Sequence, residues 1–293
     1  MKTQCTTKKT ILILLTVIFM PIYSLAYITV SGDVSGQTWT NSDTYYVESV
    51  TTVARNTTLE IEPGTVVKFA PGAYLNVRGT LIATGTSSDQ IIFTSRDDDT
   101  VGEIIAESDG DPNPGDWSAL YFQGNSSNQG IANMDYCQVL YGGSNSVGNA
   151  SALYLYAVDE GYVTNSTVKH SIQNGVYISQ VNTLTFDLND VSDNATNGVL
   201  QSSGQVNITN CELNNNGLWA LKIENSNLRG YSGNSGAGNF YDAIAIQGTV
   251  NENLTLSETI SGLPFVVTGL VTVLKDISLT FLPGEIIKLT GGQ

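Results

Sequence analysis

The sequence predicts an all-β fold in which the chain winds into a parallel β-helix of roughly eight to ten coils, each of about 22–23 residues. Three observations lead to this prediction: short apolar runs separated by glycine turns, apolar positions that recur at nearly constant spacing, and a segment that returns near the end of the chain. Beyond the first 26 residues, the apolar runs are too short for buried helices, so the pattern favours a solenoid built from strands.

The glycine turns are clearest in residues 58–95. Apolar runs of two or three residues alternate there with the breakers Pro63-Gly64, Pro71-Gly72, Gly79 and Gly85. No Asn-Gly or Asp-Gly pair joins two of these runs as a tight hairpin. Strands that keep turning in one sense are therefore favoured over an antiparallel meander.

Constant spacing appears from residue 134 onward. An apolar-x-x-small-x-apolar unit is centred on Cys137, Ser166, Asn189 and Cys211, and the last three centres are 23 and 22 residues apart. A second set of apolar positions begins at Leu153 and recurs after 23, 23, 22 and 23 residues. Such spacing is typical of the rungs of a parallel β-helix, which stack about 4.8 Å apart. Cys137 and Cys211 would then lie about 14 Å apart, too far for a disulfide, so we expect two buried free thiols.

An internal repeat supports the same fold. Residues 265–289 match residues 45–69 at a constant offset of 220, with identical residues that include Leu59/Leu279, Pro63-Gly64/Pro283-Gly284 and Lys68/Lys288. Residues 265–293 are therefore predicted to be the start of a second repeat copy, which the sequence cuts off at Gln293.

The domain organisation follows from the start of the chain. Lys2, Lys8 and Lys9 precede an apolar run at residues 11–20 and a Ser24-Leu25-Ala26 exit, so residues 1–26 are predicted to be a cleaved signal peptide. Residues 27–44 are predicted to form an N-terminal cap or lead-in, and residues 45–293 the β-helix, with an acidic loop at 97–116. We expect a secreted protein, extracellular or on the cell surface.

The charge balance limits the partners. The chain has 27 acidic and 12 basic residues and a formal net charge of −15. This charge argues against nucleic acid or an anionic membrane surface as partner. Beyond the signal peptide, no run reaches the roughly 18 apolar residues of a membrane span, so we expect no membrane insertion. The two cysteines outside residues 1–26 provide no disulfide framework.

Several short sequence motifs resemble those of a known family. They are LEIEPGTVVKF at 59–69, GTLIATGT at 79–86, IIFTS at 91–95 and, after the acidic loop, GDWSALYF at 115–122. Over nearly all of residues 45–293, the chain resembles right-handed parallel β-helix proteins of the pectin-lyase-like superfamily, and within it exported bacterial surface proteins. The resemblance implies a right-handed coil. It does not imply one activity, because the superfamily includes lyases, hydrolases, adhesins and scaffolds.

The acidic loop is the first candidate site. Asp109, Asp111 and Asn113 place oxygen ligands at alternate positions, and Asp116 adds a fourth, as a hard cation such as calcium prefers. The pattern is not an EF-hand, because Pro114 stands where that loop needs glycine and Leu120 where it needs a bidentate glutamate. The pattern is compatible with two interpretations: a loop that binds a calcium ion, and a solvated acidic loop without an ion.

The second candidate is a column of tyrosines. Aligning the rungs places Tyr121, Tyr154 and Tyr177 one above another, followed by Leu200 and Lys222. These residues alternate with inward apolar residues, so they are predicted to point outward. Stacked tyrosines about 5 Å apart could form a platform for sugar rings, or a self-stacking ladder that shields the sheet.

Two pairs of polar residues could serve an enzyme. His170 is predicted one rung from Asp193, as a general base would require, and Asp190 one rung from Glu212, as two glycosidase carboxylates would require. Exposed turns on successive rungs also bring polar residues together by chance. The motifs of the superfamily's enzymes are absent: His170 is followed by Ser171 rather than glycine, and the arginines do not cluster with acids as in pectate lyases.

The function that we favour from the sequence is that of an exported, non-catalytic module that contacts a polysaccharide or cell-surface glycan. The alternatives are a polysaccharide lyase or glycoside hydrolase, and a passive structural spacer.

Overall fold

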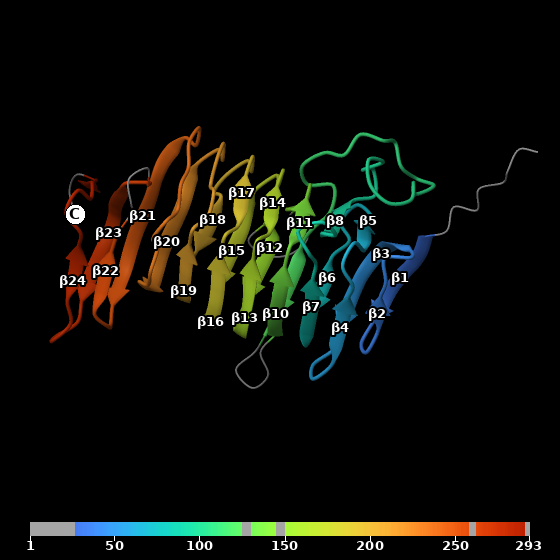
Figure 1. Cartoon of the computed structure of the whole chain (residues 1–293), viewed down its shortest axis with the longest axis horizontal. Coiled ribbons are helices and arrows are strands. Elements are labelled where there is room, and N and C mark those ends of the chain that lie inside the picture. Colours follow the sequence, from blue (N-terminus) through green and yellow to red (C-terminus); the bar gives the residue numbers. More distant parts are fainter. Residues whose placement is uncertain (1–26, 125–129, 145–149, 258–261, 291–293) are drawn as a thin grey trace, which may run out of the picture.

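The computed structural model describes residues 27–124, 130–144, 150–257 and 262–290. The predicted signal peptide lies outside the described residues. The chain forms an elongated stack of coils with the described ends at opposite ends of the molecule (Figure 1). Every pairing between named strands is parallel, as a parallel β-helix requires. Among the described residues, no helix is long and apolar enough to cross a membrane.

Three faces surround the interior of the coils. The first face contains β6 (Leu75–Val77), β9 (Leu120–Gln123), β12 (Ser151–Tyr156), β15 (Asn174–Ser179), β18 (Val199–Gln201), β25 (Ile287–Leu289) and the first halves of β20 (Trp219–Asn227), β21 (Tyr241–Val250) and β23 (Phe265–Val273). The second face contains β2 (Thr38–Trp39), β4 (Thr58–Ile61), β7 (Thr80–Thr84), β10 (Gly130–Asp135), β13 (Val158–Thr164), β16 (Val181–Asp187) and β19 (Gly204–Thr209). The third face contains β5 (Val66–Phe69), β8 (Ile91–Ser95), β11 (Cys137–Leu140), β14 (Thr167–Lys169) and β17 (Asp190–Ser192).

Long strands link the faces at the N-terminal end. β3 (Thr44–Val53) pairs through its first half with β5 on the third face and through its second half with β6 on the first face. The segment predicted as a lead-in contributes β1 (Tyr27–Asp33), which pairs with β3, and β2, which pairs with β4. Near the C-terminus, β22 (Leu254–Leu256) pairs with β24 (Leu279–Phe281).

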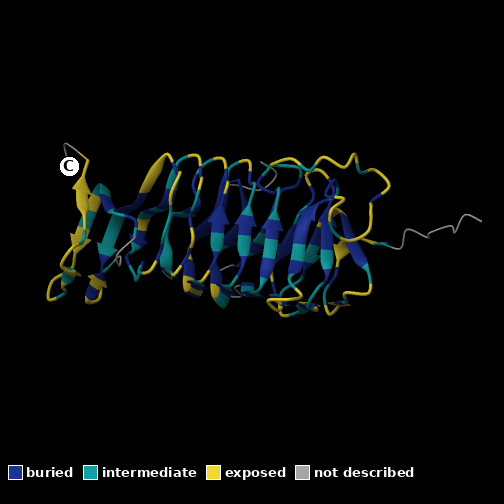
Figure 2. Cartoon of the chain, turned by 45° about the horizontal axis from the view of Figure 1, so that its top comes forward, coloured by how far each residue is buried: buried dark blue, intermediate teal, exposed yellow. Residues whose placement is uncertain are grey.

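The predicted rung register is confirmed. Leu153 pairs with Val176, Val176 with Val199, Val199 with Leu221, and Leu221 with Ile244. All five side chains are fully buried. Inward residues of successive coils therefore stack into one continuous apolar core along the helix axis, which Figure 2 shows as a dark blue interior.

The corners of the coils explain the many asparagines. The Asn194 side-chain oxygen accepts a hydrogen bond from Ser171 N at 3.0 Å, and its amide donates to the Asn216 oxygen at 3.0 Å. Asn216 repeats this contact with Asn239 on the next rung at 3.0 Å. These buried amides satisfy backbone groups that a turn leaves unpaired, so the ladder is a structural requirement of the fold.

The cysteines belong to a neighbouring corner column. Cys137 N donates to the Ser166 hydroxyl, and Cys211 N donates to the Asn234 side-chain oxygen, each at 3.0 Å. Both thiols are free and fully buried, as predicted. Burial raises the pKa of both, that of Cys211 to about 12. A buried thiol that stays protonated is a poor nucleophile, so the cysteines are structural.

Candidate functional site

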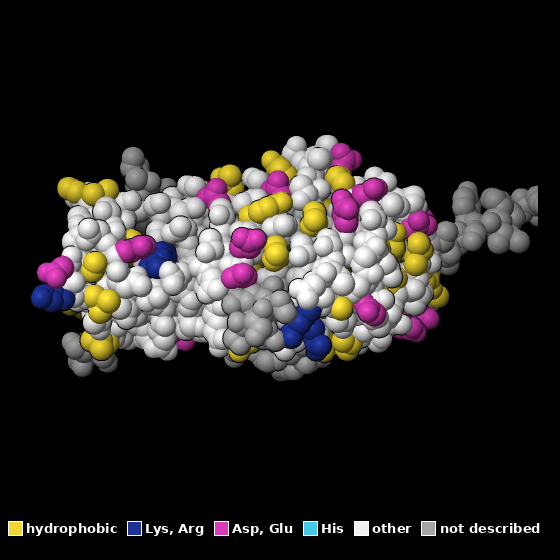
Figure 3. Space-filling view, turned by 90° about the horizontal axis from the view of Figure 1, so that it is seen from below, with side chains coloured by type: hydrophobic (Ala, Val, Ile, Leu, Met, Phe, Trp, Pro, Cys, Tyr) yellow, Lys and Arg dark blue, Asp and Glu magenta, His cyan; other side chains and the backbone are white. Residues whose placement is uncertain are grey.

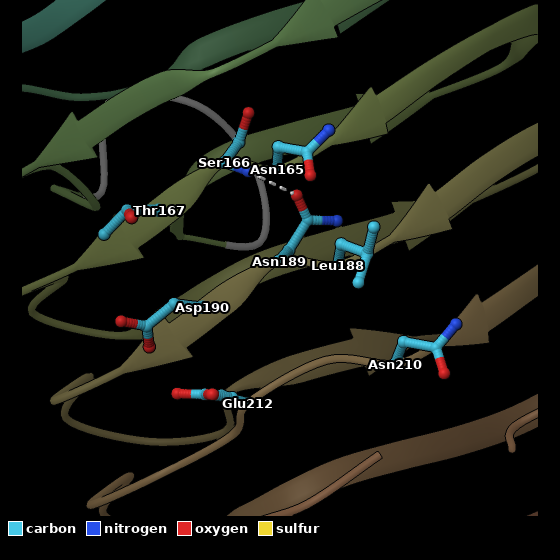
Figure 4. Close-up of a pocket in the computed structure, with 8 residues that line it drawn as sticks. All are labelled: Asn165, Ser166, Thr167, Leu188, Asn189, Asp190, Asn210 and Glu212. Atoms are coloured by element: carbon cyan, nitrogen blue, oxygen red, sulfur yellow. Dashed lines mark hydrogen bonds between the residues drawn. The ribbon is translucent and has the colours of Figure 1, made fainter. Parts of the chain in front are cut away.

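A polar groove lies where the second and third faces meet, and it contains the predicted carboxylate pair (Figure 4). The groove has a volume of about 300 Å³. Asp190 and Glu212 occupy bridged positions on adjacent rungs, and both side chains lie at one end of the groove. The remaining lining residues are Asn165, Ser166, Thr167, Leu188, Asn189 and Asn210. The groove therefore presents mostly amide and hydroxyl groups beside two carboxylates.

Backbone geometry builds the other end of the groove. Asn165, Leu188 and Asn210 occupy the same corner on three rungs, with φ angles of 48°, 57° and 52°. Asparagine tolerates this left-handed conformation better than other residues with a side chain beyond Cβ, and leucine rarely adopts it. Leu188 is also 54% exposed. The corner thus places two amides and one apolar side chain in a short row at the surface.

Both carboxylate oxygens of Asp190 contact neighbouring side chains. Its Oδ2 lies 2.5 Å from the Lys169 ammonium, and its Oδ1 accepts a hydrogen bond of 2.5 Å from the Ser192 hydroxyl. A general acid must hold a proton, and a nucleophile needs an accessible oxygen. Lys169 and Ser192 therefore fix the position of the Asp190 carboxylate at one end of the groove and use part of its acceptor capacity.

His170 and Asp193 are neighbours by register, since Lys169 pairs with Ser192 one residue earlier. Both occupy a left-handed corner, with φ angles of 58° and 59°. The His170 ring stacks on Tyr141 at a centroid distance of 5.1 Å. Among the described residues, no hydrogen bond or ion pair joins His170 to Asp193, so the structure gives the histidine a packing role.

The acidic loop folds over the third face, and its side chains bond largely to the loop itself. Asp116 Oδ2 accepts hydrogen bonds from the Ser95 hydroxyl at 2.7 Å and from Asn113 N at 2.8 Å. Asp109 Oδ1 accepts one from Asp111 N at 3.1 Å. Across the described residues, no three His, Cys, Asp or Glu side chains come together as a metal site. Calcium at Asp109, Asp111, Asn113 and Asp116 stays a prediction.

A buried lysine lies beneath this loop. Lys68 stands between Tyr46 and Thr94 on the third face, is fully buried, and its ammonium has no hydrogen-bond partner among the described residues. Burial lowers its pKa, and the nearby carboxylates, Asp99 first, oppose that shift. The loop therefore encloses one protein cation among its acids, which the sequence analysis did not anticipate.

The tyrosine column stacks as predicted on the outer side of the first face. Tyr121 pairs with Tyr154 and Tyr154 with Tyr177. Both ring pairs have centroids 4.8 Å apart, the first stacked and the second edge-to-face. With Tyr74, Tyr156 and Leu200, they form an apolar cluster separate from the interior core. Desolvation, followed by the neighbouring tyrosines, raises the pKa of Tyr121 to about 12.

Exposure differs along the column. Tyr154 and Tyr177 are only 6% and 7% exposed, whereas Tyr121 is half-buried. The observed ring contacts are those of a self-stacking ladder. A sugar could reach the edges of Tyr121, Tyr74 and Tyr156, but not the ring faces of all three predicted tyrosines.

The charges are unevenly distributed. The side of the molecule in Figure 3 carries acidic side chains at many positions and Lys or Arg at few. A polyanion would meet repulsion over most of such a surface, so the charge favours neutral partners.

Asp190, Glu212 and the tyrosine column were predictable from the sequence because rung spacing fixes which residues are neighbours. Lys169 and Ser192, which contact Asp190, were not predicted. The rung alignment gave a usable signal, because Lys169 and Ser192 each lie two residues after the aligned pair Thr167 and Asp190.

No family model, curated protein or solved structure matches the chain.

Proposed function

We propose that the chain is a divergent member of the pectin-lyase-like superfamily, exported to the cell surface or beyond, and that it contacts glycans without cleaving them. The observation that carries the proposal is the aromatic cluster outside the core, on the first face. Tyrosines on the outside of a solenoid are not needed to fill its interior. Tyrosine also combines a flat apolar ring with a polar hydroxyl, as polyhydroxylated ligands require.

The contacts of Asp190 with Lys169 and Ser192 support binding rather than catalysis, because they use part of the acceptor capacity of its carboxylate. The amide nitrogens of Asn165 and Asn210 donate to Asp135 and Asp187 at 2.8 Å, and the groove supplies their remaining hydrogen-bonding groups for hydroxyls on another side of the coil. A long, rigid stack of coils can present both surfaces at fixed spacing.

The proposal is tested by retention of the purified protein on immobilised neutral and acidic polysaccharides. Tyr121→Ala is expected to weaken retention about two- to tenfold, since one aromatic contact contributes roughly 0.5–1.5 kcal/mol. Tyr162→Ala is the matched control, because Tyr162 is also half-buried but lies on the second face. Equal retention of both variants and the wild type would refute a role for the cluster.

The enzymatic alternative rests on the groove of Asp190 and Glu212. If it is correct, the protein shortens a polysaccharide, and Asp190→Asn and Glu212→Gln each abolish shortening while the fold is retained. Polymer length by size-exclusion chromatography measures this directly. Loss of activity in neither variant would move the search for an active site elsewhere.

A further inference from the structure

An aromatic cleft opens on the first face near the C-terminal end of the coils. Its volume is about 550 Å³, within the range of small-molecule sites. Trp219, Phe240 and Tyr241 contribute aromatic rings, and Asp242 and Lys288 contribute charges. Ala243 and Val266 also line the cleft, and such short side chains leave room beside the rings.

The three rings form one unit. Trp219 pairs with Tyr241 on the next rung, and their rings stack with centroids 4.2 Å apart. The Phe240 ring meets Tyr241 edge-to-face at 4.7 Å. Phe240 is 71% exposed and Tyr241 is 43% exposed. A contiguous exposed aromatic group beside a cleft marks a binding surface more strongly than scattered apolar residues do.

The fold does not require aromatic residues at these positions. Trp219 continues a column that carries Asn174 and Asn197 on the two preceding rungs, where the Asn197 amide donates to the Asn174 oxygen at 2.8 Å. On the next rung the backbone N of Trp219 donates to the Asn197 oxygen at 3.3 Å. The Asn197 oxygen is therefore satisfied by backbone, although the side chain in the column changes from a small amide to a large indole.

The two charged side chains at the cleft, Asp242 and Lys288, are opposite in charge and come from different strands. Asp242 Oδ1 accepts hydrogen bonds of 2.8 Å from both the backbone and the side-chain nitrogen of Asn239. This fixes the carboxylate at the rim. Lys288, across the sheet on β25, is exposed. One acceptor group and one donor group therefore flank the aromatic wall.

The cleft continues the tyrosine column. Tyr177 is followed outward along the same face by Leu200, Lys222, Ala245, Val266 and Lys288. Ala245 lies three rungs beyond Tyr177, about 14 Å at the usual stacking distance. The aromatic cleft and the tyrosine cluster therefore lie on the same face, along the coil axis.

We propose that this cleft binds pyranose units of a neutral, linear polysaccharide, with sugar C–H faces on Phe240 and Tyr241 and hydroxyls on Asp242 and Lys288. The inference rests on the proposed glycan-contact function and names a site for it. Flat aromatic faces suit a sugar whose C–H groups point to one side, and the cancelling charges of Asp242 and Lys288 suit an uncharged ligand. The formal charge of −15 disfavours a polyanionic chain.

Tryptophan fluorescence reports on this cleft directly. Trp39 and Trp117 are 1% and 0% exposed, whereas Trp219, the third of the three tryptophans, is half-buried. Acrylamide should therefore quench mainly Trp219. In the purified full protein, cellohexaose is expected to protect Trp219 from acrylamide in a saturable manner.

Variants separate the cleft from the rest of the surface. Phe240→Ser and Tyr241→Ser are each expected to weaken cellohexaose binding about two- to tenfold, since each removes one aromatic contact. Ile104→Ser is the control, because Ile104 is 48% exposed and lies in the acidic loop. Hexagalacturonate is expected to give no protection.

Three results would overturn the inference. If polysaccharides are retained but cellohexaose leaves Trp219 quenching unchanged and both serine variants bind normally, the cleft is not the site, while the proposed function stands. If hexagalacturonate alone protects Trp219, the assignment to a neutral sugar is wrong. If neither retention nor protection is found with any saccharide, the proposed function and the cleft fall together.

Discussion

The two copies of the repeat, residues 45–69 and 265–289, share local structure but differ in burial. Asn56 and its counterpart Asp276 have φ angles of 60° and 64°, and Gly64 and Gly284 have φ angles of 81° and 97°. Tyr45 pairs with Val67, and Phe265 pairs with Ile287, in both cases 22 residues later. Yet Phe69 is fully buried, whereas its counterpart Leu289 is 77% exposed. The last strand, β25, is exposed along its whole length at the C-terminal end of the stack (Figure 2).

The copies also lie on different faces. The rung stack of Phe265, followed back through Ile244, Leu221 and their predecessors, reaches Thr51 on the first face. Tyr45, the counterpart of Phe265, belongs instead to the third face. The repeated sequence therefore encodes a pair of turns and bent strands, and not a fixed position around the coil.

This comparison shows that the burial of a rung depends on the next rung. β5 is covered on one side by β3 and on the other by β8. Among the described strands, β25 pairs only with β23. In solenoids, stability is approximately a sum of terms within each repeat and terms between neighbours. Equivalent substitutions in the two copies are therefore expected to differ in energetic cost, although the two sequences are similar.

The largest expected difference concerns the paired core positions. Phe69→Ala is expected to lower the free energy of unfolding by about 3–5 kcal/mol, because it leaves a cavity beside the Trp117 ring, which stacks on Phe69 at 4.1 Å. Leu289→Ala is expected to change it by less than about 0.5 kcal/mol. Denaturant titration of both variants measures this. Equal changes in the free energy of unfolding would mean that coverage by the next coil does not determine the cost of truncating these side chains.

The turn glycines should behave alike, in contrast to the core positions. Gly64→Ala and Gly284→Ala each force a side chain into the left-handed region, at a cost of roughly 1–2 kcal/mol. Neither site has an atom closer than 3.5 Å to the added Cβ, so backbone conformation sets the cost. Hydrogen exchange of the flanking amides follows each turn separately. A penalty at Gly64 alone would show that burial, rather than conformation, requires this glycine.

The smallest expected effect is a pH dependence at Lys68. Its pKa is lowered in the folded state, so between that pKa and the unfolded value near 10.5 the unfolded chain binds more protons. Stability therefore rises with pH across this window and gains nothing further above it. Relative to Lys68→Met, the wild type should become more stable as pH rises towards about 10.5.

Lys288→Met is the matched control for Lys68, since Lys288 is its exposed counterpart in the second copy. Its pH profile of unfolding is expected to follow the wild type closely. If Lys68→Met also follows the wild type, the buried ammonium is not energetically distinct, and the account of the enclosed cation is wrong.

The fold was largely predictable because its signals are local and periodic. The rung register from Leu153 to Ile244 follows from spacing alone, and small residues at Cys137 and Asn189 mark a crowded corner. The site was less predictable. The sequence placed Tyr154 and Tyr177 outward but could not show that they are covered, because exposure depends on side-chain packing around the column. One register irregularity between β20 and β21 lies between Trp219 and Leu221, so the spacing of 23 from Leu221 to Ile244 would place Asp242, not Tyr241, opposite Trp219.

The most direct test of the central claim is to incubate the purified protein with neutral polysaccharides and to follow protein and polymer by size-exclusion chromatography. We expect the protein to co-elute with polymer of unchanged length, because the aromatic surface binds and Asp190 is engaged by Lys169 and Ser192. Shortened polymer would contradict it and would make the groove at Asp190 and Glu212 an active site.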